Sequence, residues 1–478
     1  MSLPASASSP AVRWIFWGLV AVVVLAPLPL GSNRPLPGAL LVAATGSLLI
    51  LWSLYLALTK ERFRAGALRP LLAPAVLYTL VLVWILLQWL PLPSILAEIN
   101  PSWGDPLWAE ASQALGLSLP ARISIDPAAT LEGGLRLLAY AGIFWLTFQL
   151  TRDPARAAQA RIAIIAAGAA YSLYGLFAFF GGEAWLLGEV GANSPDALTS
   201  SFVNRNSFAT FGGLTLLAAM SLFLERIRHL LALERPLRRK FPLIVEHMVL
   251  QSGWLTGAIL VIALALFLTV SRGGIFASLF ALGALVLLQL PGRRSTARRP
   301  LGFVVLIIVG VAVVAGGGNL IDRLERTGLS VESDLRTTIF STTIVAIKTA
   351  PLKGTGFGTY DQAIEPYRVN DPNIFTRWEK AHNTYLENAL ELGLPAALAL
   401  NLAVLLMART AFQGVRARRR FKGFPALGVA ATLLVGLHAF VDFSLQIPAV
   451  AVLYAFIMGL AIAQSSPSSE KPALPVEA

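Results

Sequence analysis

The chain has no cysteine, little charge and few histidines. Without cysteine it can form no disulfide framework, no thiolate metal site and no cysteine nucleophile. Only 13% of its residues are charged, whereas soluble domains carry about 25%. The four histidines lack the paired spacing of metal ligands and are His229, His247, His382 and His438. These deficits argue against a soluble domain and against a metal cluster.

Long apolar runs take the place of the missing charge. Hydrophobic residues make up 56% of the chain, and runs of about 20 residues, enough to cross about 30 Å of hydrocarbon, recur along it. The first run ends at Pro27-Leu28-Pro29 without a small-residue cleavage site, so we expect it to remain as the first span. The sequence predicts an all-α integral membrane protein with about twelve transmembrane helices. The expected spans are 12–30, 38–58, 71–90, 131–150, 162–181, 206–224, 254–270, 273–290, 301–317, 385–408, 426–441 and 445–463.

Basic residues fall into alternate loops between these spans, which accounts for the net charge of +12. The positive-inside rule places loops rich in Lys and Arg in the cytoplasm. These loops are 60–69, 152–161, 226–240, 293–299 and 416–422. The loops between them are poor in basic residues or balanced by acids, so both termini are predicted to be cytoplasmic. The external segments are then 91–130, 182–205 and 318–384.

The topology divides the chain into five parts. They are a cytoplasmic end at 1–11, spans one to nine at 12–317, a large external loop at 318–384, spans ten to twelve at 385–463, and a tail at 464–478. The tail is rich in Ser and Pro, and we expect it to be disordered and cytoplasmic. No internal repeat is evident, which disfavours an inverted-repeat transporter.

The large external loop has a pattern of its own. Ser333-Asp334 can cap a helix, and Leu335, Ile339 and Ile347 recur near helical spacing until Pro351. We expect an amphipathic helix here, on the outer membrane surface or on the bundle. The following Gly354-Thr355-Gly356-Phe357-Gly358 lacks the motifs of nucleotide-binding loops, so it predicts a tight structural turn.

His382 lies where this polar loop meets the next apolar run. Thr384 and Glu387 have the spacing of a capping box, so a helix is predicted to start at Tyr385. His382 would then precede a helix N-terminus, where backbone N–H groups and the helix dipole favour an anion. A lone histidine is usually structural, but this one lies beside an anion site at a membrane surface. Glu391, one turn after Glu387, has no evident role.

Arg272 joins two apolar runs within Val270-Ser271-Arg272-Gly273-Gly274. A single helix over 254–290 would be about 55 Å long, too long for a bilayer, so the chain must reverse at this point. The topology puts Arg272 on the external side, where the positive-inside rule disfavours arginine. The structural alternative is a snorkelling side chain that positions the helix end.

Arg205 also lies at the external start of a span, within Asn204-Arg205-Asn206. The flanking amides can hold its guanidinium or bind a hydroxyl-rich ligand, whereas a polar helix cap is the structural alternative. If Arg205, Arg272 and His382 converge, they would suit a diphosphate, because arginine presents a planar fork to phosphate oxygens.

Two more charged residues are weaker candidates. Asp442 lies in the short external turn between the last two spans, where it could orient His382 or Arg272 or be an ordinary turn residue. Arg336, at the start of the predicted loop helix, could contact a ligand, although a surface charge is the simpler explanation.

These motifs resemble the O-antigen ligase and O-antigen polymerase family of bacterial membrane glycosyltransferases. The family has a His-Asn-x9-Gly-x-x-Gly signature. The chain matches it with His382-Asn383, nine further residues and Gly393, and has Ala396 in place of the last glycine. Other parts of the chain are also similar to family features. They are residues 334–360, Asn-Arg-Asn around Arg205, Ser-Arg-Gly-Gly around Arg272, and Asp442. The resemblance covers about 200–463.

The resemblance implies a C-type glycosyltransferase-like bundle with a large helical periplasmic loop, in the bacterial inner membrane. The donor would be a glycan on undecaprenyl diphosphate, attacked by a hydroxyl of lipid A–core or another glycan acceptor. Arg205 and Arg272 would bind the diphosphate, and His382 would be a general base or a further diphosphate ligand. The family works without a metal or cofactor, and the partners would be donor, acceptor and membrane lipids, with no nucleic acid. The substrate-binding candidates are Asn204, Asn206, Arg336, Asn383 and Asp442.

The motifs serve ligases and polymerases alike. A ligase is favoured because the histidine signature and the single large loop near the C-terminus fit it, and a protein O-oligosaccharyltransferase is a more distant alternative. A membrane transporter of lipid-linked or anionic substrates would need charges and broken helices near the midplane. A scaffold for envelope assembly would not need Arg272 and His382 together.

Overall fold

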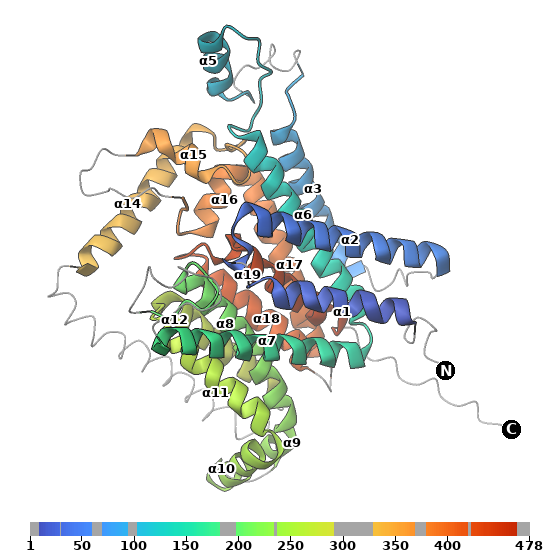
Figure 1. Ribbon diagram of the computed structural model, residues 1–478. Helices are drawn as coiled ribbons and strands as arrows, with labels where there is room; N and C mark the ends of the chain where they lie inside the picture. The colour runs from blue at the N-terminus through green and yellow to red at the C-terminus, as the bar shows by residue number, and fades with distance from the viewer. Residues whose placement is uncertain are drawn as a thin grey trace.

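The structure, a computed structural model, describes residues 9–28, 30–59, 69–93, 103–181, 197–233, 237–290, 328–368, 379–418 and 422–465. Every regular element in these residues is a helix, in agreement with the all-α prediction (Figure 1). The predicted span at 301–317 and most of the predicted tail lie outside the described residues.

Each of the other predicted spans overlaps a helix. These helices are α1 (Pro10–Leu25), α2 (Pro35–Thr59), α3 (Leu72–Trp89), α6 (Pro127–Leu150), α7 (Pro154–Gly181), α8 (Arg205–Arg226), α11 (Gly253–Leu268), α12 (Arg272–Gln289), α17 (Leu394–Ala417), α18 (Gly423–His438) and α19 (Pro448–Ala463). Among the described residues, 6 helices are long and apolar enough to cross a membrane, or up to 7 if a bent pair ending in α11 is one span. Helices α1, α18 and α19 are apolar but shorter. The total of twelve spans stays a prediction.

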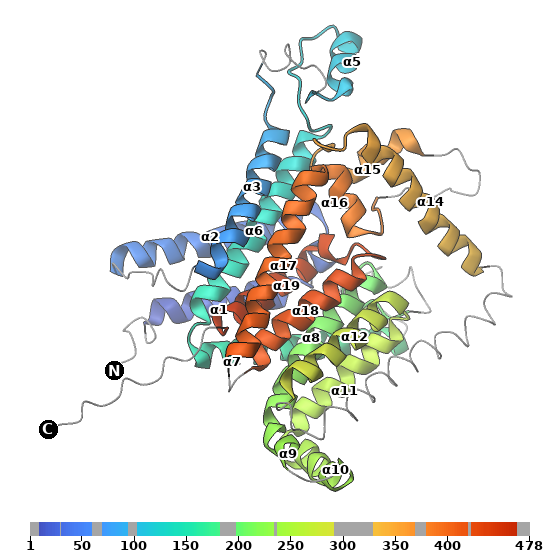
Figure 2. The same cartoon turned by 180° about the vertical axis from the view of Figure 1, so that it is seen from behind.

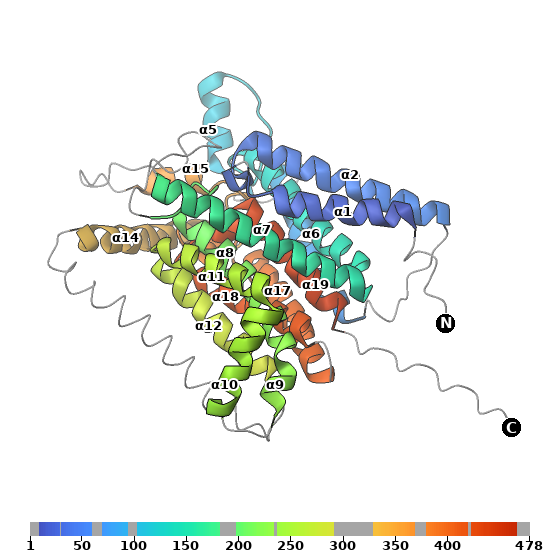
Figure 3. The ribbon, with the colours of Figure 1, turned by 60° about the horizontal axis from the view of Figure 1, so that its bottom comes forward.

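Helix α8 forms the centre of the bundle. Its most apolar window is 89% buried, and it packs against α7, α11, α12 and α18. The outer helices α2 and α17 are only 17% buried and present leucines outward, such as Leu40 at 61% and Leu398 at 66% exposure. Figure 2 shows α17 beside α3 on one side of the bundle, and Figure 3 shows α1 and α2 running together along another. A packed centre inside an apolar surface is the arrangement of a multi-pass membrane protein.

Several basic loops meet at one end of the bundle. Arg161 near the start of α7 pairs with Glu225 near the end of α8 at 2.6 Å. Glu225 also accepts the backbone N–H of Gly423, at the start of α18, at 3.0 Å. Gln464, directly after α19, accepts a hydrogen bond from Arg418 at 3.2 Å. Three of the loops that the sequence assigned to one membrane face, at 152–161, 226–240 and 416–422, therefore lie at the same end of the bundle.

The candidate site residues lie at the other end of the same helices. The 22 residues of α8 separate Arg205 from Arg226 by about 33 Å, close to the thickness of the hydrocarbon layer. Beyond this end lie α5 (Pro106–Leu115), α14 (Gly328–Thr349), α15 (Tyr360–Ile364) and α16 (Thr384–Leu392) (Figure 1). The chain reverses between α11 and α12 at residues 269–271, as the lengths of the apolar runs predict.

The amphipathic helix expected in the large loop is α14, which begins at Gly328, before the predicted cap at Ser333. Ile339 and Ile347 are buried, as their spacing predicts. The helix packs against α16 and α15. Of the two predicted locations, the structure therefore supports the one on the bundle.

The predicted span at 385–408 is wrong as a single helix, because the chain breaks at Gly393. Gly393 has a φ of 78°, and an added Cβ would lie 2.4 Å from the carbonyl oxygen of Leu352. The N–H of Leu394 donates to the carbonyl of Pro351 at 2.8 Å. The glycine allows the backbone around Pro351 and Leu352 to approach, and the break separates α16 from the membrane-length helix α17.

Candidate active site

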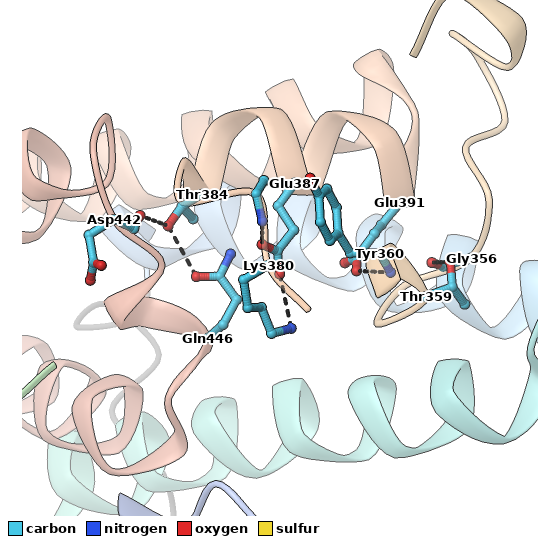
Figure 4. A network of polar contacts seen from close by, with 10 residues as sticks. Gly356, Thr359, Tyr360, Lys380, Thr384, Glu387, Glu391, Asp442 and Gln446 are labelled. Atoms are coloured by element: carbon cyan, nitrogen blue, oxygen red, sulfur yellow. Dashed lines mark hydrogen bonds and ion pairs between the residues drawn. The ribbon is translucent and has the colours of Figure 1, made fainter. Parts of the chain in front are cut away.

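Helix α16 begins at Thr384 and is capped by Asn383. The Asn383 Oδ1 accepts the backbone N–H groups of Tyr385 at 3.0 Å and Leu386 at 3.1 Å. The predicted cap, Thr384, was therefore wrong by one residue. Its hydroxyl instead donates to the carbonyl of Asp442 and to Oε1 of Gln446, each at 3.1 Å. Thr384 thus binds the start of α16 to the turn between α18 and α19 (Figure 4).

Two further contacts hold the start of α16 to this turn and to the end of α18. The Asn383 Nδ2 donates to the carbonyl of Phe440 at 3.0 Å, and the hydroxyl of Tyr385 donates to the carbonyl of Gly436 at 2.8 Å. Both ends of the buried Asn383 amide are therefore used within the protein. This geometry favours a role in positioning His382 over direct substrate binding.

His382 occupies a strained position between anchored neighbours. Its φ is 51°, a left-handed conformation that is uncommon for residues other than glycine. Ala381 before it donates its N–H to Oε2 of Glu387 at 3.0 Å, and Asn383 after it caps α16. Its ring meets Phe443 edge-on with 4.9 Å between centroids. Strain of this kind persists only where the surroundings enforce it, and it is common at functional sites.

The starts of α8 and α12 are joined to each other by side chains. Asn204 caps α8 by accepting the N–H of Asn206 at 2.7 Å. Ser271 caps α12 by accepting the N–H of Gly274 at 3.3 Å, and its hydroxyl donates to Oδ1 of Asn206 at 2.7 Å. Asn206 therefore links the two helix N-termini that carry Arg205 and Arg272.

Asp442 connects this pair of helices to α16. Its side chain is fully buried and accepts hydrogen bonds from Asn206 Nδ2 at 3.1 Å and from the hydroxyl of Ser444. Its carbonyl accepts from Thr384 on α16. Asp442 is thus a connector between three chain segments, and its carboxylate contacts Asn206, where the sequence suggested Arg272 or His382.

The structure brings the predicted residues to one polar end of the bundle. Arg272 is exposed on the first turn of α12, and Arg205 is half-buried on the first turn of α8. Arg336 is half-buried on α14 and interacts electrostatically with His438. In the described part of the chain, no three His, Asp or Glu side chains are grouped closely enough to hold a metal.

His438 is a central residue that sequence reasoning passed over. It is 3% exposed, its Nδ1 lies 2.7 Å from the hydroxyl of Thr210 on α8, and its ring lies against the first turn of α12. A Cβ on Gly273 would come 3.1 Å from its Cδ2, and one on Gly274 would come 3.4 Å from its Cε1. The two glycines after Arg272 therefore let this ring approach the helix. The available signal was the position of His438 four residues before Asp442.

A second polar cluster holds α16 from beneath (Figure 4). Lys380 Nζ pairs with Oε1 of Glu387 at 3.1 Å, and Oε1 of Glu391 accepts the N–H of Tyr360 at 3.0 Å. The carbonyl of Glu391 accepts the N–H of Gly356 at 3.0 Å. Glu391, which had no role in the sequence, thus fastens the loop at 354–360 to α16.

The glycines of this loop form the predicted structural turn. Gly354 and Gly356 have φ values of 68° and 108°, in a region that L side chains rarely adopt. A Cβ on Gly354 would lie 2.3 Å from the carbonyl oxygen of Glu391. The turn is therefore explained by its contact with α16.

Replacing Glu391 by glutamine is expected to weaken the pH dependence of thermal stability. Burial raises the pKa of Glu391, which lies outside α17, from 4.5 to about 8, and the carboxylate of Glu387 adds to the effect. The folded protein then binds the proton more tightly than the unfolded chain does. The stabilisation of the folded protein by this proton is complete below about pH 4.5 and lost above about pH 8. Between these values the free energy of unfolding falls by at most about 1.4 kcal/mol per pH unit.

The measurement is the apparent unfolding temperature of the purified protein at about pH 5.5 and about pH 8.5, on either side of most of this titration. The wild type should unfold at a lower temperature at the higher pH, and Glu391→Gln should show a smaller difference. Glu379→Gln, which removes an exposed carboxylate nearby, should behave like wild type. Equal differences in wild type and Glu391→Gln would contradict the assignment.

The joined N-termini of α8, α12 and α16 define the chemistry of the polar end. Each helix N-terminus carries a partial positive charge, which favours a bound anion, although the first N–H groups of α16, at Thr384, Tyr385 and Leu386, are already bonded within the protein. Arg205 and Arg272 add full positive charges in the first turns of α8 and α12. Asp442 is the acidic residue among the side chains that join the three helices. The arrangement suits a ligand with more than one negative charge, such as a diphosphate.

Fold and site together define a multi-pass helical membrane protein with arginines at one polar end. A family model described as O-antigen ligase matches residues 257–401. The match covers less than half of the chain and confirms the resemblance to the O-antigen ligase family, over a shorter range than 200–463. It includes Arg272, Arg336 and His382, whereas Arg205 and Asp442 lie outside it. No curated protein matches the chain.

Proposed function

We propose that the protein is an O-antigen ligase-like glycosyltransferase of the bacterial inner membrane. It transfers a glycan from undecaprenyl diphosphate to a hydroxyl of lipid A–core or another surface carrier on the periplasmic face. The observation that carries the proposal is the joining of three helix N-termini beside Arg205, Arg272 and His382. The family match supports the same chemistry.

The proposed reaction forms one bond and breaks one. The acceptor oxygen bonds to the anomeric carbon of the donor sugar while the bond from that carbon to the diphosphate oxygen breaks. The electron pair leaves with the lipid diphosphate, and the acceptor proton passes to His382 as general base. Arg205 and Arg272 stabilise the charge that develops on the leaving diphosphate.

The other candidates serve this geometry in different ways. Asn206 and Asp442 hold the starts of α8, α12 and α16 together, and Asn383 fixes the backbone of His382. Arg336 adds positive charge on the side of α14. Asn204 caps α8. These residues are positioning residues, and the reaction needs neither a metal nor a cofactor from them.

The proposed topology has twelve spans with both termini in the cytoplasm. The clustering of basic loops at one end and of site residues at the other supports it. A polymerase that joins lipid-linked repeat units remains the alternative, because the site chemistry is the same for either acceptor. A transporter is less well supported, because the candidate charges lie at helix ends and a transporter needs them near the midplane.

Deletion of the gene in its host tests the proposal and separates the alternatives. A ligase predicts that glycan disappears from lipid A–core while long lipid-linked chains accumulate, as read on a gel and by lipid extraction. A polymerase predicts short glycans of a single repeat unit. Wild-type complementation should restore the original pattern. Surface and lipid-linked glycans that are unchanged by deletion would contradict both activities.

A further inference from the structure

Helix α10 (Leu237–Glu246), with the π-helical turn His247–Gln251, leaves the bundle at a sharp angle. The segment Arg238–Gln251 is bent by 98° from Gly253–Leu268, which contains α11. Figures 1 and 3 show α10 beside α9 (Arg228–Ala232) at the end of the bundle away from α14 and α15. If α11 crosses the bilayer, α10 runs along its surface.

The bend lies at the level of an interfacial tryptophan. Trp254, at the start of α11, is 48% exposed, and the guanidinium of Arg226 lies 5.4 Å from its ring centroid. Arg226 also donates to the hydroxyl of Ser252, in the bend itself, at 3.2 Å. Tryptophan is enriched at the membrane–water boundary. Helix α10 therefore departs at the depth of the headgroups, at the end that carries the basic loops.

One side of α10 is held by the protein. Lys240 is 1% exposed, and its Nζ donates to the carbonyl of Leu231 at 2.8 Å. The rings of His247 and His229 meet edge-on with 6.0 Å between centroids. These contacts fix which face of α10 turns outward.

The outward face carries an apolar stripe. Phe241, Val245 and Val249 recur every four residues and are 64%, 39% and 65% exposed. Exposed Arg238 and Arg239 lie at the N-terminal end of the same helix. An apolar stripe bordered by arginines on a helix in the membrane plane matches an interfacial amphipathic helix. Arginines at the cytoplasmic surface are attracted to anionic lipids.

We propose that α10 lies in the membrane–water interface and binds anionic phospholipid. Phe241, Val245 and Val249 pack among acyl chains, and Arg238 and Arg239 bind lipid phosphates. The inference is independent of the proposed glycan transfer. A protein partner on the same stripe is the competing occupant, but the perpendicular bend and the arginines favour the bilayer.

The absence of native cysteine allows a direct test on the full chain. Phe241→Cys is spin-labelled in protein reconstituted into phosphatidylcholine vesicles containing phosphatidylglycerol. Glu246→Cys, an exposed polar position about 100° around the helix from Val245, is the matched control. Collisions with oxygen, which partitions into lipid, are compared with collisions with a water-soluble nickel chelate. The label at 241 should favour oxygen, and the label at 246 should favour nickel.

The alternatives give different results. Preferential nickel collisions at both positions would place α10 in water and overturn the proposal. Exclusion of both reagents at 241 would show a covering protein and would also overturn it. Both variants carry exposed substitutions, and size-exclusion elution of the labelled protein at the wild-type position confirms folding.

The arginine contribution is measured in the same Phe241→Cys background. In protein that keeps Arg238 and Arg239, the spin label at 241 should lie deeper in the bilayer of vesicles with phosphatidylglycerol than in pure phosphatidylcholine. Arg238→Gln with Arg239→Gln should abolish that shift while the label still favours oxygen. A shift that persists in the double variant would overturn the assignment of phosphate binding to these two arginines.

Discussion

Replacing His382 by alanine is expected to lower the rate of glycan transfer by about 100- to 10,000-fold, the range of general acid–base catalysis. The site would still bind an anion through the helix N-termini and both arginines, so donor binding should change much less than turnover. The measurement is transfer from purified lipid-linked glycan to acceptor, with the maximal rate and the KM for donor obtained separately. If His382 is instead a diphosphate ligand, the KM for donor rises.

His229→Ala is the matched control for this prediction. His229 is on α9, at the basic end of the bundle, about one membrane thickness from the site. Its replacement should leave transfer near the wild-type rate. A folded His382→Ala protein that also keeps the wild-type rate would remove His382 from the mechanism.

Replacing Arg272 by alanine is expected to reduce transfer by about 100- to 1,000-fold, the cost of losing one preorganised group that stabilises developing charge. Arg272→Lys should recover only part of this loss, because an ammonium is a point charge and cannot grip two phosphate oxygens as a planar fork does. The assay measures transfer by both variants over a range of donor concentrations.

Arg13→Ala is the control for Arg272. Arg13 is an exposed arginine on α1, in the first turn of a helix that the proposed topology starts at the cytoplasmic face. Transfer by this variant should match wild type. Full activity of Arg272→Lys together with loss in Arg272→Ala would show that charge alone suffices, and would contradict bidentate phosphate binding.

Local properties of the sequence predicted much of the fold. The apolar runs gave the positions of the described spans because crossing a bilayer demands a set length of apolar chain. The same argument required the reversal at Arg272, since one helix over both runs would be too long. The buried face of α14 also followed from helical spacing. All of these depend on residues close together in the chain.

The structure corrected the sequence where distant segments meet. Thr384 has the spacing of a cap, but its hydroxyl bonds to Asp442 and Gln446 and leaves Asn383 as the cap. The span at 385–408 was predicted as continuous because a hydropathy pattern contains no information about the close approach of the Leu352 carbonyl to Gly393. Contacts with residues far along the chain decided both points.

The sequence by itself determined that this is a helical membrane protein, and it predicted which loops share a face and which charges are unusual at their positions. Only the tertiary structure decided that the starts of α8, α12 and α16 are joined through Asn206, Ser271, Asp442 and Thr384, and that His438 lies against Gly273 and Gly274. The physical reason is one of range. Hydrophobic length and charge alternation act along the chain, whereas a hydrogen bond needs two groups within about 3 Å, whatever their separation in sequence.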